Sequence, residues 1–206
     1  MKLILATGNP HKIEMLTWIC EPYFDDIIPQ DKSIDINEDG KTFQENAEKK
    51  AVEVSRMYGC CAVATDGGVS IPALGDNWNG LLTKRFIGRE DATDIDRIEA
   101  LLDLMKDKKG DERAIVWNEA IALANNGELL FSTQVEGDNG MVQTNYNPYQ
   151  YQEGIWQCTV TCYPQFGGKN YFELNDEERQ YSEISWHRLK KGMDDYLCVQ
   201  SNLVTK

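Results

Sequence analysis

Short apolar runs and amphipathic stretches follow one another from the start of the chain. Leu3 to Thr7 is a nearly continuous apolar run, which is typical of a buried strand. Asn9 is a favourable N-cap, and Pro10 suits the first position of a helix. The pattern therefore predicts a strand, a tight turn and a helix that ends near Glu21. Asp25 to Pro29 is predicted to form a second strand.

A polar, acidic segment from Asp31 to Lys41 interrupts this pattern and is predicted to be a loop. Thr42 to Glu45 fits a capping box, and apolar residues recur behind it at helical spacing as far as Tyr58. Cys61 to Ala64 predicts a buried strand that ends at Thr65 to Gly68. We therefore expect a loop, a helix and a buried strand in this part of the chain.

The second half of the chain is predicted to hold two helices and three strands. Asp91 is expected to cap a helix that runs to Met105, and Ser185 is expected to cap the last helix. The predicted strands and turns are Ala114 to Ala124, a turn at Asn125 to Gly127, Leu129 to Val135, a turn at Gly137 to Gly140, and a strand near Ile155 to Tyr163. Strands and helices mix without strict alternation, which indicates an α/β or α+β class with a largely mixed sheet.

Composition limits the classes of function. The 206 residues suit a single domain, and their formal net charge is −13. We expect no general binding to nucleic acid or to an anionic membrane surface, because both are polyanions. The apolar run at the start is too short for a membrane helix or a signal peptide, so a cytoplasmic protein is expected. Its six cysteines are then reduced core thiols, and two histidines without a Cys-x-x-Cys pair argue against a zinc site.

Two segments have the residue types of an anion site and a metal site. Thr7 to Lys12 places free backbone N–H groups and a lysine at a predicted helix N-terminus, which suits a phosphate. The same residues also suit an ordinary capped helix with a solvated lysine. Glu38 and Asp39 lie on the acidic loop, where paired carboxylates either hold Mg²⁺ or face solvent in a turn.

Three further positions have both a functional and a structural interpretation. Asn46 and Lys50 flank the apolar stripe of their helix, so Lys50 either borders a site or extends along apolar surface toward water. Asp66 follows a buried strand, at an edge where ligands collect in α/β sheets, or it forms a plain turn. His187 and Arg188 lie near a predicted helix N-terminus, where an anion would balance their charge; otherwise they are a surface pair.

In this order, the motifs resemble those of the inosine triphosphate pyrophosphatase family, the Ham1-like pyrophosphatases. The matching segments are Leu3 to Asn9 with Lys12 and Glu14, Glu38 to Ala47, Lys50-Ala51, Ala64 to Val69, Ala73 to Gly75, Phe172 to Leu174 and His187-Arg188. Residues 1–75 match specifically, residues 76–140 loosely and residues 141–185 poorly.

The resemblance implies an elongated α/β fold in which helices flank a mixed sheet, with two lobes in one domain (1–206) and the active cleft between them. It also implies a homodimer and Mg²⁺-dependent hydrolysis of nucleoside triphosphates, such as dITP and XTP, to monophosphate and pyrophosphate. Asp66 and Lys50 are the implied catalytic residues, and Glu38, Asp39 and Asp66 are the implied metal ligands. The implied substrate contacts are Thr7, Gly8, Asn9, Lys12, Gly67, Lys84, His187 and Arg188.

The sequence departs from the family pattern at three places. Thr65 stands where many members have the first of two adjacent aspartates, and Trp186 interrupts a Ser-His-Arg triplet. The aromatic segment that shapes the base pocket has no clear counterpart. These departures predict an altered base preference, with Trp156, Tyr163 or Trp186 as stacking residues. The alternatives are a pyrophosphatase for a standard or modified pyrimidine nucleotide, and a nucleotide-binding protein with weak catalysis.

Overall fold

The computed structural model describes residues 1–89 and 91–204, with the side chains of residues 1–89 and 91–199. The chain divides into two compact units. The first holds residues 1–67, 119–135 and the chain from Ser185 onward, and the second holds residues 68–118 and 136–184. Three long strands contribute residues to both units.

The described residues form one mixed sheet with helices around it. The strands are β1 (Lys2–Leu5), β2 (Asp26–Pro29), β3 (Cys61–Ser70), β4 (Ala114–Asn125), β5 (Glu128–Val142), β6 (Thr161–Tyr163) and β7 (Lys169–Asn170). Their order in the sheet is β2-β1-β3-β4-β5-β6-β7. Because β1 pairs parallel with β2 and β3, whereas β6 pairs antiparallel with β5 and β7, the predicted mixed α/β sheet is confirmed.

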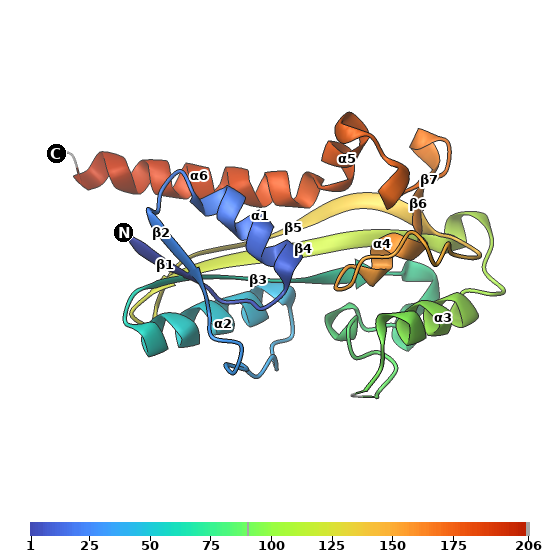
Figure 1. Cartoon of the computed structure of the whole chain (residues 1–206), viewed down its shortest axis with the longest axis horizontal. Helices are drawn as coiled ribbons and strands as arrows, with labels where there is room; N and C mark the ends of the chain where they lie inside the picture. Colours follow the sequence, from blue (N-terminus) through green and yellow to red (C-terminus); the bar gives the residue numbers. More distant parts are fainter. Residues whose placement is uncertain (90, 205–206) are drawn as a thin grey trace. The chain divides into compact units, whose positions relative to one another are not determined.

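The longer helices are α1 (Pro10–Cys20), α2 (Phe43–Tyr58), α3 (Asp94–Leu104) and α6 (Ile184–Val204), and the short ones are α4 (Trp156–Val160) and α5 (Asp176–Ser182). In the first unit, α1 and α6 lie on one side of the strands and α2 lies on the other (Figure 1). Leu3, Val63 and Ile121, from three adjacent strands, pack in one core with residues of α1 and α6. Side chains alternate between the faces of a strand, so neighbouring residues of β1 and β3 point toward α2.

Local sequence explains why α1 and α2 begin where they do. The Asn9 side chain accepts hydrogen bonds from the backbone N–H groups of His11 (2.9 Å) and Lys12 (3.4 Å), so both are satisfied at the start of α1. The Thr42 hydroxyl accepts from the Glu45 N–H at 3.0 Å and caps α2. The Glu45 carboxylate accepts from Lys41 instead of Thr42, so only half of the predicted capping box forms.

The β4–β5 hairpin has the turn that its sequence predicts. Asn126 (φ 50°) and Gly127 (φ 84°) both adopt left-handed backbone conformations, which a two-residue hairpin turn requires and which Asn-Gly favours. The Gly127 N–H also donates to the Ser55 hydroxyl on α2 at 2.9 Å. The hairpin is therefore held to the same unit as α2.

The second unit has its own apolar core and buried polar anchors. Ile71, Trp78, Leu101 and Trp156 are buried in this core. The buried Arg113 guanidinium donates to four backbone carbonyls, those of Met105, Lys108, Val142 and Gln143, which ties the end of β5 to the segment after α3. An arginine can be buried here because every hydrogen bond that it donates finds a carbonyl.

Several predicted boundaries are wrong. Strand β3 continues to Ser70, so Asp66 and Gly67 lie inside it and not at its end. Helix α3 is capped by Thr93, which forms a complete capping box with Asp96, and not by Asp91. Local capping geometry, more than the nearest acidic residue, sets where this helix starts.

Three further differences come from pairing that is not local. Residues 137–140 lie within β5, because Gly140 is packed closely against Thr161 of β6 and leaves no room for a side chain. Residues 156–160, predicted as strand, form α4, and only residues 161–163 pair in the sheet. Helix α6 begins at Ile184, so Ser185 is inside its first turn, and the sequence pattern did not reveal α5.

Surface and thiol chemistry complete the description. All six cysteines are thiols outside disulfides, as predicted, but only Cys20, Cys61 and Cys158 are buried, so the predicted core position is wrong for the other three. Among the described residues, no helix combines the length and the apolar character needed to cross a bilayer.

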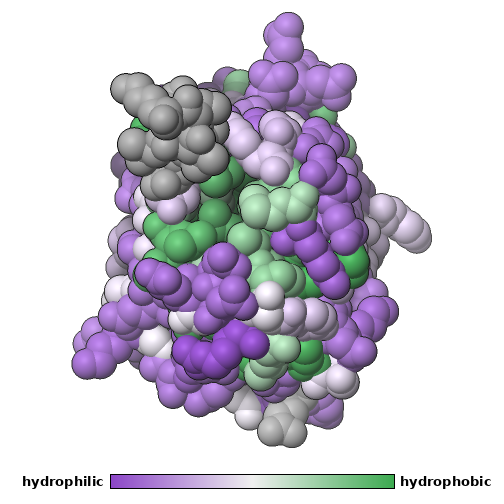
Figure 2. Space-filling view, turned by 90° about the vertical axis from the view of Figure 1, so that its left-hand side faces the viewer, coloured by the Kyte–Doolittle hydropathy of each residue, from purple (hydrophilic) through white to green (hydrophobic). Residues whose placement is uncertain are grey.

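The first unit exposes several large apolar side chains, namely Met1, Ile28, Met57, Leu129 and Leu130. Figure 2, which views the side on which β1, β2 and α2 lie, shows apolar residues interrupting the hydrophilic surface.

Candidate functional site

Asn46 joins the acidic loop to strand β3. Its side chain is on α2 and is buried, with only 3% exposed. Its Oδ1 accepts from the Gly40 N–H at 2.8 Å, and its Nδ2 donates to Asp66 Oδ2 at 2.9 Å. A Cβ at Gly40 would lie 2.6 Å from Asn46 Oδ1, so this approach needs a glycine. The loop backbone and the Asp66 carboxylate are thus fixed by one amide.

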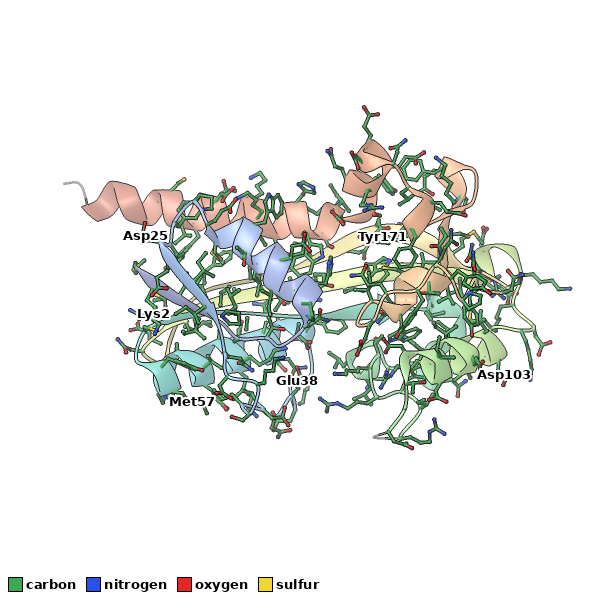
Figure 3. All side chains as sticks on the ribbon, viewed as in Figure 1. Lys2, Asp25, Glu38, Met57, Asp103 and Tyr171 are labelled. Atoms are coloured by element: carbon green, nitrogen blue, oxygen red, sulfur yellow. The ribbon has the colours of Figure 1, made fainter. Side chains whose placement is uncertain are left out.

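Lys50 lies one turn further along α2, between two carboxylates. Its Nζ is 2.8 Å from Glu38 Oε1 and 3.6 Å from Asp66 Oδ1. The three side chains are 13% (Lys50), 29% (Glu38) and 13% (Asp66) exposed, so the group is screened from bulk water on most sides. Figure 3 shows Glu38 on the loop that precedes α2. Among the predicted residues, the structure therefore brings together Glu38, Lys50 and Asp66.

Asp39 points away from this group. Its carboxylate pairs with Lys49 at 2.7 Å, and its side chain is 62% exposed. The hydrogen bond from Lys49 lowers the pKa of Asp39, which keeps it ionised at the surface. Of the two acidic residues that the sequence left as alternatives, the structure places Glu38 beside Asp66 and Asp39 beside solvent.

The turn before α1 lies at a helix N-terminus, where the Asn9, His11 and Lys12 N–H groups already donate to side chains. The Thr7 hydroxyl accepts from the Asn9 N–H at 3.2 Å and shapes the turn. No atom lies within 4 Å of the position that a Cβ at Gly8 would occupy, so the backbone is open to a ligand there. Lys12 is half-buried in the first turn of α1. This geometry suits an anion, because the helix dipole and the lysine both favour negative charge.

Glu119, on β4, is a functional candidate that the sequence reasoning missed. It is 7% exposed, and its carboxylate occupies the space that any side chain at Gly67 would fill. Burial raises the pKa of Glu119 to about 7. The positive charge of Lys12 opposes this shift, the negative charge of Asp66 adds to it, and the positive charge of Lys50 again opposes it. A lone acidic residue inside an apolar strand was the signal that would have identified it.

The remaining predicted contacts lie elsewhere. Lys84 is exposed and belongs to the second unit. His187 and Arg188 are exposed in the first turns of α6, where the His187 ring packs edge-on against Trp18 with ring centroids 5.1 Å apart. The roles proposed for Lys84, His187 and Arg188 stay predictions.

The three proposed stacking residues are core side chains. Trp156, Tyr163 and Trp186 are only 3%, 1% and 5% exposed. Trp156 packs against Phe86, and Trp186 packs edge-on against His11. Their rings have no open face for a base, so the predicted stacking role does not fit the structure.

The residues present are suited to a divalent cation bound together with phosphates. No group of three metal-ligating side chains lies close enough for a closed site in the part of the chain that the structure describes. Mg²⁺ does not need one, since it is usually held by one or two carboxylates, water and substrate phosphates. Asp66 and the unpartnered Oε2 of Glu119 are such carboxylates. The structure is therefore that of an α/β protein in which Glu38, Lys50 and Asp66 lie together.

Comparison with known proteins gives the family. Residues 3–188 match the sequence model of the Ham1 family. The chain belongs to this family. It is 40% identical over 119 residues to the dITP/XTP pyrophosphatase of Photorhabdus laumondii, a match that covers 57% of this chain and 59% of that protein. It is 33% identical over 177 residues to the dITP/XTP pyrophosphatase of Legionella pneumophila, covering 79% of this chain and 87% of that protein.

Solved structures confirm the fold. A HAM1 protein from Coxiella burnetii superposes on this chain with a TM-score of 0.76 at 24% identity. The superposition covers 98% of this chain and 99% of the Coxiella chain. A nucleoside-triphosphatase / dITP/XTP pyrophosphatase from Mycobacterium abscessus superposes with a TM-score of 0.68 at 26% identity, covering 93% of this chain and 98% of its own.

Proposed function

We propose that the chain hydrolyses nucleoside triphosphates between the α- and β-phosphates and releases a nucleoside monophosphate and pyrophosphate. Non-standard purine nucleotides of the dITP and XTP type are the proposed substrates, because the relatives carry those names. The observation that carries the proposal is Lys50, held at 2.8 Å from Glu38 and 3.6 Å from Asp66 at a half-buried position. Phosphoryl transfer depends on such positioning and charge neutralisation more than on covalent chemistry.

Each group has a role that follows from its chemistry. The backbone at Gly8, which leaves room for a ligand, and the Lys12 ammonium bind phosphate oxygens. Lys50 neutralises charge on the phosphate chain while Glu38 holds it in place. Asp66 would hold Mg²⁺, which would supply Lewis-acid stabilisation of the developing charge.

Asp66 has a second role, which Asn46 makes possible. Because Asn46 Nδ2 holds one carboxylate oxygen of Asp66, the orientation of the other is fixed. A carboxylate with a fixed orientation can position a water molecule and accept its proton during attack on the phosphorus. Asn46 acts only through Asp66 and is a positioning residue.

The wider setting of the enzyme is part of the same proposal. We infer a single two-lobed domain over residues 1–206, a homodimer, Mg²⁺ as the metal and a cytoplasmic location. The apolar side chains that the first unit exposes are consistent with a homodimer, since a second copy would cover such groups.

Pyrophosphate release tests the proposal. The unmodified chain is incubated with Mg²⁺ and, separately, with dITP, XTP and each standard triphosphate. Asp66→Asn is expected to lower kcat at least about 100-fold, equivalent to ~2.7 kcal/mol of barrier. Asp35→Asn, on the exposed part of the acidic loop, is the matched control and is expected to change kcat less than twofold.

Two results would contradict the proposal. The first is a protein that binds nucleotide and never releases pyrophosphate, which would indicate a binding protein. The second is an Asp66→Asn variant as active as its parent. A preference for a pyrimidine triphosphate would leave the reaction intact and would support the altered base preference instead.

A further inference from the structure

The sheet has a gap beside β3 where β1 ends. The pairing between β1 and β3 runs to Leu5 and Val63, after which the chain turns through Thr7 into α1. Strand β3 continues to Ser70. The edge of β3 around Asp66 is therefore not covered by β1, and the N-terminus of α1 starts nearby. A side chain from either face of the sheet can reach a ligand at such an edge.

Glu119 reaches toward this gap across a glycine. Residues two apart on a strand share a face. Glu119 therefore lies on the same face of β4 as Ile121, which packs in the core with α1 and α6, and Gly67 lies on the same face of β3 as Val63. Any Cβ at Gly67 would overlap the Glu119 carboxyl group. Because Gly67 has no side chain, the Glu119 carboxylate lies over the β3 backbone at this point, and Gly67 itself is partly exposed.

One oxygen of this carboxylate has no hydrogen-bond partner among the described residues. Glu119 Oε2 is buried and accepts no hydrogen bond from any described residue, and the same holds for Thr65 Oγ1 on the same face of β3. The charged side chains whose fields reach Glu119 are Lys12, Asp66 and Lys50. A buried charge is normally paired or bound to a metal, because leaving it alone is very unfavourable. A cation at this face of β3 would satisfy the buried Glu119 oxygen.

We propose that Glu119 is a ligand of the catalytic divalent cation, together with Asp66. The two carboxylates come from the neighbouring strands β3 and β4. Two carboxylates with water and phosphate oxygens complete a coordination shell that Mg²⁺ accepts. This inference rests on the proposed function, because the cation serves the same phosphate chain.

Metal binding without nucleotide tests this directly. Mn²⁺, a spectroscopic substitute for Mg²⁺, is titrated into the metal-free protein and followed by electron paramagnetic resonance. Glu119→Gln keeps the shape of the side chain and removes its charge. It is expected to raise the Mn²⁺ dissociation constant at least about tenfold, because losing even a residue that only supports a metal ligand weakens metal binding by about that factor. Gly67→Ala is expected to do the same, because its methyl group displaces the Glu119 carboxylate.

The controls make each outcome decisive. Glu128→Gln removes an exposed carboxylate from the same hairpin and is expected to leave Mn²⁺ affinity within about twofold. Circular dichroism shows which variants are folded. If Glu119→Gln does not fold, Glu119→Asp is measured in its place. A change of less than tenfold in folded Glu119→Gln overturns the proposal, as does a parent protein that binds no Mn²⁺ at millimolar concentration. Failure of the proposed function would show separately, as absent pyrophosphate release from the parent.

Discussion

Asp138 is a buried carboxylate in the second unit whose ionisation opposes folding. It lies on β5 and is 2% exposed, and neither of its oxygens has a hydrogen bond of good geometry within the described residues. Burial raises its pKa from 3.8 to about 7, although the nearby Tyr163 hydroxyl offsets part of the shift. The charged form is unfavourable there because the surroundings solvate it poorly.

The sign of the pH dependence follows from this direction. Between pH 4 and pH 7 the folded chain keeps a proton on Asp138 that the unfolded chain has lost, so stability falls as pH rises through this window. At 1.36 kcal/mol for each pKa unit, the loss between pH 5 and pH 8 is ~2 to 3 kcal/mol. Asp138→Asn removes this titration and keeps the shape of the side chain.

Urea denaturation at pH 5, 6, 7 and 8 measures the effect. The stability of Asp138→Asn relative to its parent is expected to rise by ~2 to 3 kcal/mol from pH 5 to pH 8. Glu119 and the other titrating groups are present in both proteins and cancel in the difference. A difference that is constant over this range would refute the reasoning, because Asp138 would then ionise as it does in water.

Two further predictions concern the loop and α2. Lys50→Met removes the cation that joins the acidic loop to β3 and is expected to lower kcat/KM at least about 100-fold. Lys49→Met, the control, breaks an exposed pair and is expected to change kcat/KM less than about twofold. Equal losses in the two variants would mean that the ion pairs act only on folding. Gly40→Ala places a methyl carbon 2.6 Å from Asn46 Oδ1 and is expected to destabilise the fold by ~1 to 3 kcal/mol in thermal melts, together with lower activity. An unchanged melting temperature would show that the loop is not held by Asn46.

The parts of the fold that sequence predicted well depend on local chemistry. Asn9 caps α1 through its own side chain, and Thr42 caps α2 in the same way. The turn at Asn126 and Gly127 needs only two residues that accept left-handed backbone angles. These signals lie within a few residues of the structure that they determine, so one chain is enough to read them.

The parts that sequence missed depend on partners distant in the chain. Residues 137–140 look like a turn, but close packing with Thr161 of β6 makes them a strand. Glu38 and Asp39 cannot be separated by residue type, since only the side on which α2 presents Lys50 and Lys49 distinguishes them. Glu119 is significant only because β4 places it over Gly67. Contacts between residues distant in the chain, which no local pattern records, decide all three.

The charge of the site explains how an acidic chain can bind a polyanion. With Glu38, Asp66 and Glu119 ionised, the carboxylates around Lys12 and Lys50 carry one more negative charge than the lysines neutralise. Such a group would repel a triphosphate, and the overall charge of −13 would add to the repulsion. A divalent cation held by Asp66 and Glu119 reverses the local sign. The buried carboxylates that look unfavourable for a phosphate site are therefore what allow the cation to be held where the phosphates bind.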